Sequence, residues 1–112
     1  KLENDYRFKA IIIIILNFPE LFKVFEKQLI EIKFTNNSLH EVKEVIFSII
    51  KDNSDVSCTQ LVEILKERDL IKFLGDFRLE AIFSKLRSSD KKVKIDESRK
   101  VLEELIYMVN NN

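Results

Sequence analysis

The chain has 112 residues, a length that gives one ordinary domain around a single core. Hydrophobic residues make up 46% and charged residues 34% of the sequence, which excludes a disordered or collagen-like chain. The 19 basic and 19 acidic side chains balance, so no net field attracts nucleic acid or an anionic membrane, and we expect only weak DNA affinity. One Gly and one Pro leave little with which to build tight hairpin turns, so an all-β fold is disfavoured.

The first predicted helix spans about residues 2–17 and contains the longest apolar run of the chain, from Ala10 to Leu16. This run covers every face of a helix, so the second half of the helix should be buried all round. Its five consecutive isoleucines also suit a buried strand, but the sequence offers no partner strand, and a helix is favoured. The run is far shorter than the roughly 20 residues that a membrane crossing needs, so no membrane segment is predicted.

Two further helices are predicted from the next stretch. Asn17-Phe18-Pro19 ends the first helix, and Pro19 is expected at the first position of the second, where its missing N–H is tolerated. That second helix carries an apolar stripe. Residues 34–37 break the pattern, and Ser38 with Glu41 predicts a capping box that opens a third helix ending near Lys51.

Three more helices are predicted in the second half of the chain. Ser57 and Gln60 form a second possible capping box, which opens a helix ending around Arg68, and residues 70–74 add a turn or two. Gly75 marks a sharp corner because a glycine there can adopt positive φ. A helix is predicted over residues 79–86, and a polar run follows over residues 87–94. The last helix begins near Asp96. Its apolar face consists of Val101, Leu102, Leu105, Ile106, Met108 and Val109.

The predicted fold is therefore an all-α bundle of about six helices in a single domain, residues 1–112. Because the chain begins at Lys1, we expect it to be a fragment of a longer chain. The predicted core consists of Ile12 to Leu16, Phe22, Phe25, Val42, Ile46, Ile49, Leu61, Leu65, Ile82, Phe83, Leu102 and Ile106.

Few residues suggest catalysis or ligand binding. The single Cys58 cannot form an internal disulfide, which favours a reducing, cytoplasmic location. Near a helix N-terminus its thiol could be a nucleophile, but a small, partly buried residue is the favoured interpretation. His40 stands beside Glu41, and a solvated histidine is favoured over a metal ligand. One glycine cannot make a phosphate-binding loop. We expect no catalytic residue, cofactor or metal in this domain.

A basic segment could contact phosphates, but it contains no aromatic residue to stack on a base, so a solvated loop is favoured. Its residues are Lys85, Arg87, Lys91, Lys92 and Lys94.

Tyr107 is more informative, because it lies opposite the apolar stripe of the last helix and should point away from the core. Either its ring rests on the stem of Lys100 or Glu103, or it is a docking site for a partner or a following segment. We name Tyr107, Met108 and Lys100 as candidate partner-binding residues.

The order of these elements is similar to that of a known family. An aliphatic helix runs from Ile13 through Phe18-Pro19-Glu20 to Leu21, Phe34-Thr35 follows, and Ser38-Leu39-His40 opens another helix. This resembles the C-terminal helicase-interaction domain of bacterial replicative primase, the DnaG type, which has a His-Pro-Glu-Leu-like corner. Phe18 stands where that family has a polar residue. The resemblance covers about residues 2–65 and extends further only by helix pattern.

The resemblance implies a non-catalytic, monomeric module that binds the N-terminal domain of the replicative helicase and holds primase at the replication fork. It implies a fold similar to that helicase domain, and a parent chain that is a DNA primase, a nucleotidyltransferase whose zinc binding and primer synthesis reside in upstream domains. The family's domain continues into a C-terminal helical hairpin, and the chain stops at Asn112, before such a hairpin. Two alternatives stay open: the N-terminal domain of a DnaB-type helicase, which would self-associate into rings, and an unrelated helical adaptor.

Overall fold

The computed structural model describes residues 2–75 and 91–111. These ranges contain six α-helices and one short 3₁₀ helix, η1, and no strand, which confirms the all-α prediction for the described part of the chain. The predicted helix over residues 79–86, with Ile82 and Phe83, lies outside these ranges, as do Lys85 and Arg87. The elements are α1 (Leu2–Asn17), α2 (Leu21–Val24), α3 (Glu26–Glu31), α4 (Asn37–Asp52), α5 (Cys58–Glu67), η1 (Ile71–Leu74) and α7 (Lys91–Asn110).

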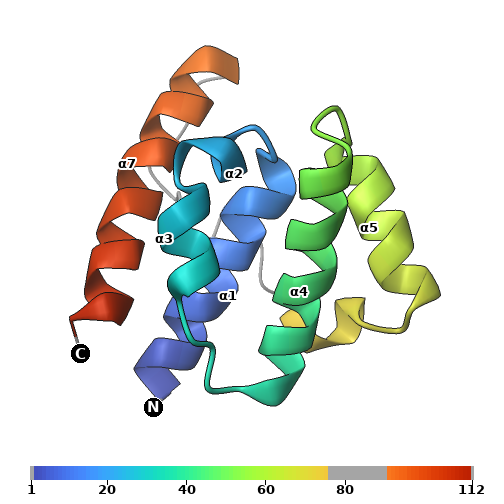
Figure 1. Cartoon of the computed structure of the whole chain (residues 1–112), viewed down its shortest axis with the longest axis horizontal. Coiled ribbons are helices and arrows are strands. Elements are labelled where there is room, and N and C mark those ends of the chain that lie inside the picture. Colours follow the sequence, from blue (N-terminus) through green and yellow to red (C-terminus); the bar gives the residue numbers. More distant parts are fainter. Residues whose placement is uncertain (1, 76–90, 112) are drawn as a thin grey trace.

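Helix α1 is the centre of the molecule, and α4, α5 and α7 pack around it (Figure 1). Every residue from Ala10 to Leu16 is buried, so the helix hides all of its faces over this stretch. The isoleucine run therefore forms a helix and not a strand, as predicted. Burial against three neighbouring helices outweighs the modest β preference of the isoleucines, because full burial of one Ile side chain contributes about 1.5 to 3 kcal/mol.

The corner after α1 differs from the prediction. Pro19 is not the first residue of a helix but lies in a turn, in which the Leu21 N–H donates to the Phe18 carbonyl at 2.9 Å. The predicted second helix is also two short helices, α2 and α3, separated at Phe25, whose φ of −120° and ψ of 22° are not helical. The Phe25 side chain is buried, so the break places its ring in the core.

Helix α4 begins at Asn37, and its cap is Asn36, two residues before the predicted cap Ser38. The Asn36 side-chain oxygen accepts a hydrogen bond from the Leu39 N–H at 3.0 Å, so the predicted Ser38–Glu41 capping box is wrong. Asn36 also donates from its side-chain nitrogen to Asp5 of α1 at 3.4 Å. This second bond favours Asn36 as the cap, because it ties the start of α4 to α1.

The ends of α5 are well defined. The predicted capping box is confirmed: the Gln60 N–H donates to the Ser57 hydroxyl at 3.2 Å, and the Ser57 N–H donates to the Gln60 side chain at 2.9 Å. At the other end Asp69 has a φ of 57°, and the Leu70 N–H donates to the Leu65 carbonyl at 2.8 Å. This is a Schellman motif, which the sequence did not predict because Asp occupies the position usually held by Gly. The predicted positive φ at Gly75 is confirmed, at 59°.

Helix α7 begins at Lys91, five residues before the predicted start at Asp96, so Lys91, Lys92 and Lys94 belong to a helix and not to a loop. Within the described residues the predicted core is confirmed with one correction, Ile49, which is partly buried and packs against the core from its edge. The core also includes residues that were not predicted, among them Phe8 and Phe34, whose rings stack with their centroids 4.4 Å apart.

Candidate functional site

The outer face of α7 carries the three predicted partner-binding residues. Tyr107 is 68% exposed, which confirms that its ring points away from the core. Met108 is 40% exposed, and Lys100 is also exposed. The opposite face of the helix packs against the core, where Leu102, Leu105 and Ile106 are buried. We call Val93, Lys100, Tyr107 and Met108 the α7 outer face.

Three members of the α7 outer face recur at a spacing of seven residues, which places Val93, Lys100 and Tyr107 on one side of the helix. Lys100 also lines a polar hollow of about 300 Å³ with Asp96, Arg99 and Glu103. No cation–π contact joins Lys100 to Tyr107 in the described part of the chain. The face therefore combines exposed apolar side chains with charges of both signs, which suits a protein partner more than a nucleic acid.

The last turn of α7 is held in place by Asn111. Its backbone N–H and its side-chain nitrogen both donate to the Tyr107 carbonyl, at 3.1 and 2.8 Å. Because this carbonyl would otherwise lack a partner at the helix end, the two bonds stabilise the backbone that carries Tyr107 and Met108.

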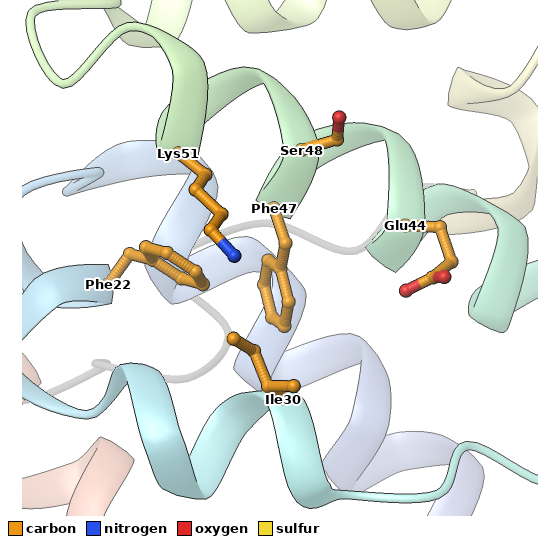
Figure 2. A pocket seen from close by; sticks show the side chains of 6 residues that line it. All are labelled: Phe22, Ile30, Glu44, Phe47, Ser48 and Lys51. Atoms are coloured by element: carbon orange, nitrogen blue, oxygen red, sulfur yellow. The ribbon is translucent and has the colours of Figure 1, made fainter.

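A second surface, which the sequence did not predict, is a groove between α3 and α4. One hollow of about 220 Å³ is lined by Phe22, Ile30, Glu44, Phe47, Ser48 and Lys51. Figure 2 shows Ile30 pointing from α3 toward Phe47 of α4, with the Lys51 amine reaching toward the rings of Phe22 and Phe47. These two rings lie 4.9 Å apart between centroids, at an angle of 47°.

The groove continues along α4 into a neighbouring hollow. Ile30 and Glu44 line both hollows, and the second one adds His40, Lys43 and the segment from Glu31 to Phe34. We call the two hollows together the α3–α4 groove. Ile30, at 48% exposure, is its most exposed large apolar side chain.

A nearly buried lysine lies in the wall of the α3–α4 groove. Lys43 is only 4% exposed, its amine lies 5.3 Å from the centre of the Phe34 ring, and it is 3.5 Å from a carboxylate oxygen of the exposed Glu44. The cation–π contact and the ion pair both offset the loss of hydration of this ammonium group.

The structure does not bring Cys58 or His40 into a reactive arrangement. Cys58 is partly buried in the first turn of α5, and burial raises the pKa of its thiol, which disfavours the thiolate that a nucleophile needs. His40 is exposed on α4. Among the side chains of the described ranges, no three His, Cys, Asp or Glu residues gather closely enough to hold a metal ion.

None of the helices in residues 2–75 and 91–111 combines the length and the apolar character that a membrane crossing needs. Comparison with protein-family models, with curated proteins and with solved structures finds no match to this chain. The fold and the two surfaces define it as a compact all-α protein with six α-helices in the described ranges.

Proposed function

We propose that this chain is a non-catalytic protein-binding domain of a cytoplasmic DNA primase, and that it binds the N-terminal domain of the replicative helicase through the α7 outer face. In this role it couples primer synthesis to the replication fork. Its bundle is proposed to be similar in fold to that helicase domain.

The observation that carries the proposal is the exposure of Tyr107 and Met108 at the end of a helix whose other face is buried. An exposed aromatic ring beside a methionine is typical of the residues that contribute most to protein interfaces. The sequence from Ile13 to Leu21 adds the resemblance to the primase family, and the balanced charge agrees with a protein partner rather than DNA.

Isothermal titration of the chain into the helicase N-terminal domain from the same source tests the proposal. We expect saturable heat, and we expect Tyr107→Ala to weaken binding at least about tenfold, because truncating an interface hot spot costs about 2 kcal/mol or more. Tyr107→Phe separates the contribution of the ring from that of the hydroxyl. Lys100→Ala should also weaken binding. Its control is Lys66→Ala, which replaces an exposed lysine of α5 and should not change the affinity.

No heat from a chain that is folded by circular dichroism would contradict the proposed partner. Equal binding by wild type and Tyr107→Ala would contradict the proposed surface.

The exposed Val93, Tyr107 and Met108 would also suit pairing between copies of α7, as in a helicase N-terminal domain that forms rings. Size-exclusion chromatography with light scattering distinguishes the two. A primase-type domain should elute as a monomer, whereas concentration-dependent oligomers that disappear in Tyr107→Ala would favour the helicase domain.

A further inference from the structure

We draw no further inference here: the strongest candidate, the α3–α4 groove around the exposed Ile30, is lined by charges of both signs, and nothing in the structure shows what covers it.

Discussion

Ser98 offers a sharp test of how α7 is held against the rest of the molecule. Its side chain is fully buried on the face that α7 shares with Leu102 and Leu105, and its hydroxyl has no hydrogen-bond partner among the described residues. A buried polar group without a partner is unfavourable by about 1 to 3 kcal/mol. Replacement by alanine should therefore stabilise the protein.

The size of the effect follows from three contributions. Removing the hydroxyl eliminates that penalty, and alanine has the higher helix propensity, by about 0.5 kcal/mol. Loss of the oxygen atom leaves a small void whose missing contacts offset about 0.5 to 1 kcal/mol. We expect Ser98→Ala to raise the free energy of unfolding by about 1 to 2 kcal/mol, and the melting temperature by about 5 to 10 °C.

Urea unfolding followed by far-ultraviolet circular dichroism measures this change, and Ser48→Ala is the matched control. Ser48 is an exposed serine within α4, so its replacement should give only the propensity gain of about 0.5 kcal/mol or less. If the Ser98→Ala protein is no more stable than wild type, the assumption that the buried hydroxyl is unpaired is refuted. That result would mean that the hydroxyl has a stabilising partner in solution.

Three other predictions concern the core, a helix end and the cysteine. Ile12→Ala, at a fully buried position of α1, should lower the free energy of unfolding by about 2 to 5 kcal/mol in urea titrations; a loss under about 1 kcal/mol would contradict the central place of α1. Asp69→Val should lower the free energy of unfolding by about 2 kcal/mol more than Asp69→Gly does, because φ at Asp69 is positive and both variants lose the same ion pair with Lys72; equal effects would argue against that backbone. Burial raises the pKa of the Cys58 thiol in the folded chain. The stability that this protonated thiol contributes should therefore be complete below the ordinary thiol pKa and should be lost as the pH rises through the pKa of the folded chain. Alkylation of Cys58 by iodoacetamide should require a higher pH in the folded than in the unfolded chain, and Cys58→Ser should remove the alkaline loss; identical alkylation profiles would contradict the burial of the thiol.

The helices themselves could be predicted from sequence because their signals are local. The apolar run of α1, the Ser57 capping box and the stripe of the last helix depend on spacing along the chain. The errors fall where two local signals compete. Asn36 and Ser38 can both cap a helix, and the hydrogen bond from Asn36 to Asp5, which lies far away in sequence, favours Asn36.

The two candidate surfaces also differ in whether local sequence signals could predict them. The exposure of Tyr107 follows from the helical period alone, so it could be predicted. The α3–α4 groove could not be, because Ile30 and Phe47 belong to different helices and only tertiary packing brings them together. The break at Phe25, which separates α2 from α3, could not be predicted either, because no Gly or Pro lies there in the sequence.

The burial of α1 also has a consequence for the unfolded chain. The stretch from Ala10 to Leu16 has no charge and no proline and is rich in β-branched residues, a composition that assembles readily into intermolecular β-sheet when it is exposed. In the native protein this stretch is covered on every side. Substitutions that loosen the packing of α7 or α4 against it should therefore be noticed in cells first as insoluble protein, before any change in binding is measured.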